Sequence, residues 1–188
     1  KVTNAWRQAQ DGTWRYLESS GAMATNKWVD NDDYYVDASG IMITNKWLQV
    51  ANSRKASGYD WYYFGNNGKC SKDKWVQIDG QYHYFGDSGV METGWILDDM
   101  YYCDDSGVMV TGWKKLTPPE EYQDADTHTG PFETASDGQY WYYFGTNGKK
   151  VVPNENGTNV KQKKINGTYY CLREDGALQT GWVCVTGD

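Results

Sequence analysis

A glycine-centred motif that recurs seven times in 188 residues constrains this chain more than any other feature. In the best-preserved copies, Tyr34 to Thr44 and Tyr101 to Trp113, an aromatic pair precedes a polar turn and a glycine, and Met and Thr follow. Repetition at a unit length of about 20 residues predicts a repeat architecture, in which each unit packs on its neighbours. The aligned glycines are Gly21, Gly40, Gly68, Gly89, Gly107, Gly148 and Gly176.

Each unit has the pattern of a β-hairpin: a strand that begins with Trp, a polar turn, an aromatic strand and a glycine turn. Asp79-Gly80 is a strong two-residue hairpin signal, and the unit that starts at Trp95 is predicted to turn at Asp98-Asp99. Because an isolated hairpin is marginally stable in water, neighbouring hairpins must stack. The sequence therefore predicts an all-β fold, a β-solenoid of stacked β-hairpins.

Period-two alternation separates the two faces of each aromatic strand. The apolar column four residues before the glycine should point inward, with the column two residues earlier at its rim. The remaining two columns share the opposite face, which Asp33 indicates is solvated. The inward column is Leu17, Val36, Phe64, Phe85, Cys103, Phe144 and Leu172, and the rim column is Arg15, Tyr34, Tyr62, His83, Tyr101, Tyr142 and Tyr170. The opposite face holds Trp14, Asp33, Trp61, Tyr82, Met100, Trp141 and Tyr169, then Tyr16, Tyr35, Tyr63, Tyr84, Tyr102, Tyr143 and Cys171.

Composition excludes some partners and makes the aromatic rings the main packing material. The chain has ten Trp and sixteen Tyr, yet its mean hydropathy is −0.82. A net charge of −7 disfavours nucleic acid, which requires clustered Lys and Arg. No apolar stretch approaches the roughly 20 residues of a membrane span. The chain opens at Lys1 inside a repeat, so we interpret it as part of a longer protein.

The repeats divide the chain into three predicted regions. Residues 1–113 hold regular repeats, residues 114–139 an insertion or degenerate repeat, and residues 140–188 C-terminal degenerate repeats of the same array. The stretch from Lys149 to Asn166 is polar and lacks a leading Trp, so a break in the stack is expected there.

Catalytic and metal-binding motifs are not found in the sequence. Four cysteines without C-x-x-C spacing or companion histidines give no zinc pattern, and we interpret them as apolar fillers, with a Cys171–Cys184 bridge as the leading alternative. His83 lies in the rim column and His128 in the irregular segment, each without a nucleophile or metal partner. The chain is therefore predicted to be no enzyme, with no cofactor, and any catalytic domain would lie outside it.

Several motifs resemble the cell-wall-binding, or choline-binding, repeats of Gram-positive surface proteins and lytic enzymes. They are Gly94-Trp95, Thr111-Gly112-Trp113, Thr180-Gly181-Trp182 and the Trp-Tyr-Tyr-Phe tetrads at 61–64 and 141–144. The resemblance implies a left-handed superhelix of hairpins that binds choline headgroups of teichoic acids between consecutive hairpins, on an extracellular protein at the cell surface or wall. Aromatic faces suit a quaternary ammonium, and repetition supplies avidity.

The resemblance also implies which residues form the aromatic cages. Each cage combines the Trp that opens a hairpin, the aromatic residue that leads its second strand, and a Tyr from the next hairpin. Departures at Asp33, Met100 and Cys171 predict weak or absent sites for Trp28, for Trp95, and for Trp113 with Trp141. The complete sets are Trp6, Trp14 and Tyr35; Trp47, Trp61 and Tyr84; and Trp75, Tyr82 and Tyr102, with Met42, Met91 and Met109 as apolar neighbours.

Two other functions and one structural explanation stay open on the sequence. The same rings could stack on glucan or surface-glycan sugars, with Asn45, Gln77 and Gln81 as hydrogen-bonding neighbours. The array could also be a spacer or a protein-binding stalk. Finally, the rings, above all those of the rim column, could simply pack hairpin against hairpin.

Overall fold

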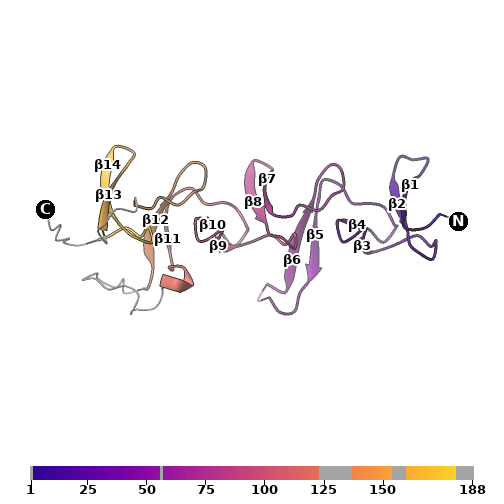
Figure 1. Ribbon diagram of the computed structural model, residues 1–188, viewed down its shortest axis with the longest axis horizontal. Coiled ribbons are helices and arrows are strands. Elements are labelled where there is room, and N and C mark those ends of the chain that lie inside the picture. The colour runs from indigo at the N-terminus through magenta and orange to yellow at the C-terminus, as the bar shows by residue number, and fades with distance from the viewer. Residues whose placement is uncertain (1, 56, 123–136, 154–159, 181–188) are drawn as a thin grey trace. The chain divides into compact units, whose positions relative to one another are not determined.

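Every strand that the structure describes belongs to a two-stranded antiparallel hairpin (Figure 1). The computed structural model describes residues 2–55, 57–122, 137–153 and 160–180, and the chain divides into two units, Lys1–Glu92 and Thr93–Asp188. The first unit contains β1 (Ala5–Gln8) with β2 (Trp14–Leu17), β3 (Lys27–Val29) with β4 (Tyr34–Val36), β5 (Lys46–Ala51) with β6 (Tyr59–Phe64), and β7 (Lys74–Ile78) with β8 (Gln81–Phe85). The second contains β9 (Gly94–Ile96) with β10 (Tyr101–Cys103), β11 (Gly112–Leu116) with β12 (Tyr140–Phe144), and β13 (Val160–Ile165) with β14 (Thr168–Arg173).

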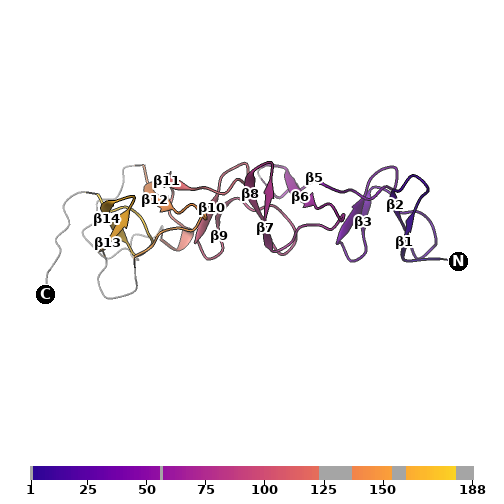
Figure 2. The same ribbon diagram turned by 90° about the horizontal axis from the view of Figure 1, so that it is seen from above.

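The predicted stack of β-hairpins is confirmed, and the same pairs can be followed from above in Figure 2. One short 3-10 helix, Glu120–Tyr122, lies between β11 and β12. Within the described ranges there is no helix of the length and apolarity that crossing a membrane requires.

The glycine turns repeat one backbone geometry. All seven aligned glycines have positive φ, from 73° at Gly40 to 88° at Gly176, and each amide donates to the carbonyl three residues earlier. Asp79 and Gly80 both have positive φ and connect the Ile78–Gln81 pair, which confirms that hairpin signal. Asn166 and Gly167 close β13–β14 in the same way. The sequence analysis missed this second signal.

The two shortest hairpins turn differently. Asp30, Asn31 and Asp32 after β3, and Leu97, Asp98 and Asp99 after β9, each form a run of three consecutive positive-φ residues. The expected turn at Asp98-Asp99 is therefore present. Non-glycine residues are strained in this region of backbone space, so these turns, with three such residues each, carry a larger conformational cost than the Asp79-Gly80 and Asn166-Gly167 turns, which have one each.

The core is a series of small clusters between successive hairpins. Six of the seven inward-column residues are completely buried, and Leu17 is half-buried. Val36 packs with Ala24 and Val29 against Trp6 and Tyr34. The equivalent cluster around Phe144 contains Leu116, Tyr142 and Ala177. In both clusters a Trp of the preceding hairpin, Trp6 or Trp95, helps to cover the next one.

The segment predicted as an insertion begins within a strand and connects the two strands of one hairpin. Strand β11 continues to Leu116, whose partner is Tyr140, so Lys114–Leu116 are strand residues. Strand β13 likewise lies within the stretch where a break was expected. The sequence analysis missed β13 because its VKQKKI sequence lacks the leading Trp.

The cysteines behave mainly as apolar fillers. Cys70 and Cys103 are buried free thiols, and burial raises the pKa of Cys70 to about 11. Cys171 is a half-buried free thiol. Its suggested partner, Cys184, lies outside the described residues, as does His128.

Candidate functional site

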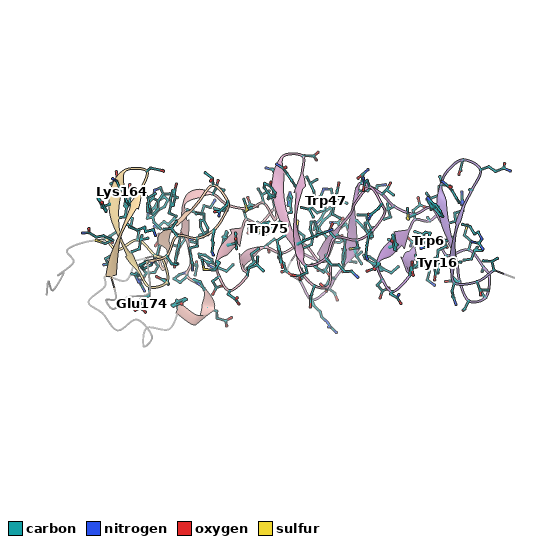
Figure 3. All side chains as sticks on the ribbon, turned by 45° about the horizontal axis from the view of Figure 1, so that its top comes forward. Trp6, Tyr16, Trp47, Trp75, Lys164 and Glu174 are labelled. Carbon is teal, nitrogen blue, oxygen red and sulfur yellow. The ribbon has the colours of Figure 1, made fainter. Side chains whose placement is uncertain are left out.

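In six of the seven described hairpins, strand pairing places the first-strand Trp over a Tyr of the second strand. The antiparallel register pairs Trp6 with Tyr16 and Trp47 with Tyr63, and Figure 3 shows Trp6 close to Tyr16. The ring centroids of the six equivalent pairs are 5.2 to 5.6 Å apart. Each Trp is therefore oriented from within its own hairpin.

Five of these Trp rings also contact the rim column of the following hairpin. Trp6 contacts Tyr34 at 5.2 Å, and Trp47 contacts His83 at 5.2 Å. Trp28, Trp95 and Trp113 contact Tyr62, Tyr142 and Tyr170, each at 4.9 Å. The expectation that the rim column packs hairpin against hairpin is thus confirmed at these five positions.

The Tyr residues assigned to the three cages contact the Trp of their own hairpin. Tyr35 contacts Trp28, Tyr84 contacts Trp75, and Tyr102 contacts Trp95. Tyr84 is also buried, and its hydroxyl donates to Asp73 at 2.7 Å, which raises its pKa to about 12. Alternation explains the difference: Tyr34 shares the face of Val36 that turns toward the preceding hairpin, whereas Tyr35 points the other way.

The aromatic residues that lead the second strands are the exposed ones. Trp14 and Trp61 are 40% and 38% exposed, and Tyr82 and Trp141 are similarly accessible. Trp61 stands at 88° to Trp47, with centroids 6.2 Å apart. The predicted solvation of this column is therefore confirmed at these four rings.

Backbone hydrogen bonds bring the Met column of the next hairpin to these exposed rings. Met42 N donates to Trp14 O at 2.9 Å, and Met91 N donates to Trp61 O at 2.8 Å. We define the Trp6 cluster as Trp6, Trp14, Tyr34 and Met42, and the Trp47 cluster as Trp47, Trp61, His83 and Met91. Of the third expected set, Trp75 and Tyr82 belong to the first unit, whereas Tyr102 and Met109 belong to the second.

An acidic side chain lies beside the Trp6 cluster. The indole Nε1 of Trp6 donates to Asp30 Oδ2 at 2.9 Å, from the turn of the next hairpin. A carboxylate at this distance holds the ring in place and adds negative potential near it.

The expected weak positions differ from each other. At Trp28, the second-strand position is Asp33, which forms ion pairs with Lys72 at 3.0 Å and Lys69 at 3.1 Å. The hydrogen bond from Lys72, followed by that from Lys69, lowers the pKa of the Asp33 carboxyl. A salt-bridge network therefore stands where Trp14, Trp61, Tyr82 and Trp141 present an exposed ring in other hairpins.

Trp113, in contrast, has a full set of neighbours. It contacts Tyr170, Trp141 is exposed on the same face, and Leu178 N donates to Trp141 O at 2.7 Å. The sequence analysis considered Cys171 at this position, whereas the ring that contacts Trp113 is that of Tyr170, from the rim column.

In the described part of the chain, there is no group of three or more His, Cys, Asp or Glu side chains that could hold a metal ion.

Comparisons with known proteins agree with the repeat geometry. Models of the choline-binding repeat match residues 1–41 and 73–112, and a model of a putative cell wall binding repeat matches residues 55–70 and 136–150. No curated protein sequence matches the chain significantly.

Solved structures are similar over nearly the whole chain. Choline binding protein F from Streptococcus pneumoniae is 31% identical, with 94% of this chain and 51% of that chain covered and a TM-score of 0.61. A structure of CbpF in complex with ipratropium is 27% identical, covering 99% and 50%, with a TM-score of 0.54. The modular autolysin LytC from Streptococcus pneumoniae, at 21% identity, 95% and 43% coverage and a TM-score of 0.53, shares the fold.

This chain therefore spans about half the length of these solved relatives. Three repeat models fall on its hairpins, and the structure repeats one Trp–Tyr arrangement from hairpin to hairpin. The chain belongs to the family of choline-binding, or cell-wall-binding, repeat proteins.

Proposed function

We propose that the chain is a non-catalytic module that attaches a protein to the bacterial surface by binding choline headgroups of teichoic acid or a related cell-wall polymer. The observation that carries this proposal is the exposed Trp61 ring standing at right angles to Trp47. Two ring faces at this angle form a corner that a compact cation can contact on two sides.

The chemistry of the ligand fits such a corner. A quaternary ammonium has no N–H donor, so ring faces are its main protein partners, and each contact contributes about 0.5 to 2 kcal/mol. The Asp30 carboxylate next to Trp6 and the net charge of −7 both favour a cation. The single-site affinity is expected to be modest, and several sites on one polymer then raise it.

The proposed contact residues follow from the exposed rings. The headgroup would contact Trp6, Trp14 and Met42 at the first site, and Trp47, Trp61 and Met91 at the second. Trp75 and Tyr82, both in the first unit, are the third proposal. Tyr84 would support binding indirectly, because it orients Trp75, whereas Tyr35 and Tyr102 contact Trp28 and Trp95, which are not proposed ligand contacts. Relatives named as choline-binding, and one solved with ipratropium, which carries a quaternary ammonium, support the ligand class.

Tryptophan fluorescence during a choline titration tests the proposal. A saturable change that ipratropium reproduces and a soluble glucan does not is the expected result. Trp14→Ala and Trp61→Ala should each reduce the signal. Tyr169→Ala, at an exposed ring outside the proposed sites, is the matched control and should leave the titration unchanged.

The same titration separates the competing functions. Saturation by glucan but not by choline would replace this proposal with sugar binding. Gln77, one of the side chains suggested to hydrogen-bond a sugar, is engaged elsewhere, because its amide donates to Gly80 O within its own hairpin at 3.3 Å. Silence toward both ligands would favour a stalk that binds another protein.

A further inference from the structure

One position in the Met column carries a charge. The residues that bridge back to the inward column are Met23, Met42, Cys70, Met91, Met109, Lys150 and Leu178. Lys150 is the charged exception, and it is only 5% exposed. A lysine is rarely buried to this extent unless its ammonium has compensating contacts, so its surroundings require an explanation.

The ammonium of Lys150 lies over two aromatic faces. Its Nζ is 4.8 Å from the centroid of Trp95 and 5.7 Å from that of Tyr142. These rings are the first-strand Trp of the β9–β10 hairpin and the rim residue of the β11–β12 hairpin, 4.9 Å apart and at 77° to each other. They correspond to Trp6 with Tyr34 and to Trp47 with His83.

The backbone holds the lysine at this place. Lys150 N donates to Met100 O at 2.7 Å, as Met42 does to Trp14 and Met91 to Trp61. The chain is thus anchored beside the second strand of the preceding hairpin, and the side chain extends from there to the rings. At the same junction, Met100 stands where the ligand clusters have an exposed Trp.

We propose that Lys150 is an internal ligand of the Trp95–Tyr142 pair, a tethered cation that occupies the position of the headgroup cation and closes this junction to choline. The inference rests on the proposed function. A cation already attached to the chain acts at a high effective concentration, so free choline competes poorly. Choline would also have to approach a like charge in a partly desolvated site.

With this assignment, one or two residues at each junction between hairpins decide whether choline can bind there. A junction with an exposed Trp and a Met would be open, whereas one with Met100 and Lys150 would be closed by the chain itself. The module would then bind fewer headgroups than it has junctions between hairpins.

Calorimetric stoichiometry of choline binding to the full chain tests the inference. Met100→Trp restores the exposed ring, and Lys150→Met restores the residue that this chain uses elsewhere in the column. Met100→Trp alone should leave the number of sites unchanged, whereas Met100→Trp with Lys150→Met should add one site per chain. Lys149→Met in the Met100→Trp background, an identical change at an exposed neighbouring lysine, should add none. Circular dichroism of each variant checks its folding.

Two results would overturn the inference: an added site in Met100→Trp alone, or no added site in the folded double variant when the wild-type chain binds choline. If the wild-type chain binds no choline, the proposed function fails, and NMR then decides the position of Lys150 independently. The Lys150 side-chain methylene protons next to Nζ should resonate upfield of those of Lys149, because ring currents shield them. Equal chemical shifts would show that the ammonium is not over the rings.

Discussion

The two Trp residues of the β5–β6 hairpin, Trp47 and Trp61, have different environments. Trp47 is surrounded by rings, namely those of Trp61, Tyr63, His83 and Phe85. Trp61 is more than one-third exposed. Packing and ligand contact are therefore assigned to different side chains of the same cluster, and substitutions should separate them.

We predict that Trp47→Ala lowers the free energy of unfolding by about 3 kcal/mol, because it leaves a void among several rings. Trp61→Ala should cost about 1 kcal/mol or less, as expected for a partly exposed side chain, and yet remove one choline site. Urea unfolding and a choline titration on both variants measure the two effects. Equal destabilisation by both substitutions would show that Trp61 is structural.

Asp33 gives a pH-dependent prediction at a junction without an exposed ring. Its folded-state pKa is lowered, chiefly by Lys72, so its contribution to stability is complete above the unfolded value of about 4 and is lost as pH falls through the folded value. The contribution is small, about 1 kcal/mol or less, because the pair is partly exposed. NMR titration of the Asp33 carboxyl should show a pKa below that of an ordinary Asp. Lys72→Met should raise it, and an unchanged value would contradict the ion pair.

At the scale of the hairpin, a turn glycine is also a contact surface for the previous repeat. Gly68 has a φ of 74°, and a Cβ placed there would lie 2.6 Å from the sulfur of Met42. Gly80 has a φ of 84° and open space around it. Gly68 therefore meets two requirements, a left-handed backbone and a close approach by Met42 of the preceding repeat, and Gly40 and Gly148 do the same with Met23 and Met109.

Gly68→Ala should consequently be more destabilising than Gly80→Ala. Both substitutions cost about 1 to 2 kcal/mol for the left-handed backbone, and Gly68→Ala also displaces Met42. Thermal unfolding of the two variants gives the comparison directly. The packing explanation would be wrong if Gly80→Ala were as destabilising as Gly68→Ala.

The features that depend on a single strand or turn were predicted from the sequence. The contacts between neighbouring hairpins were not. The buried column and the Asp79-Gly80 turn follow from alternation and turn chemistry, and both are present. Tyr35 was assigned to the Trp6 cage by resemblance, and the structure shows that the ring contacting Trp6 is Tyr34, while Tyr35 contacts Trp28 of its own hairpin. Lys150 lies in a column of Met residues, but the rings under its ammonium come from two different hairpins. The missed β13–β14 hairpin had a readable Asn166-Gly167 signal and lacked only the usual Trp.

For the whole molecule, several modest sites should act together on one polymer. The Trp6 and Trp47 clusters both belong to the first unit. Binding of one headgroup makes the next binding event intramolecular, so a choline-bearing polymer should bind about a hundred-fold or more tightly than free choline. Surface plasmon resonance on immobilised teichoic acid measures this ratio. Trp14→Ala combined with Trp61→Ala should abolish most of the gain, and equal affinity for polymer and free choline would exclude multivalent attachment.

The most direct test of the central claim is an NMR titration of the indole N–H groups with choline. The indole N–H resonances of Trp14 and Trp61, and those of Trp6 and Trp47 beside them, should shift saturably. The resonance of Trp95, whose ring lies under Lys150, should not shift. No shift at Trp14 and Trp61 up to saturating choline, or equal shifts at every Trp, would contradict a headgroup site built from these rings.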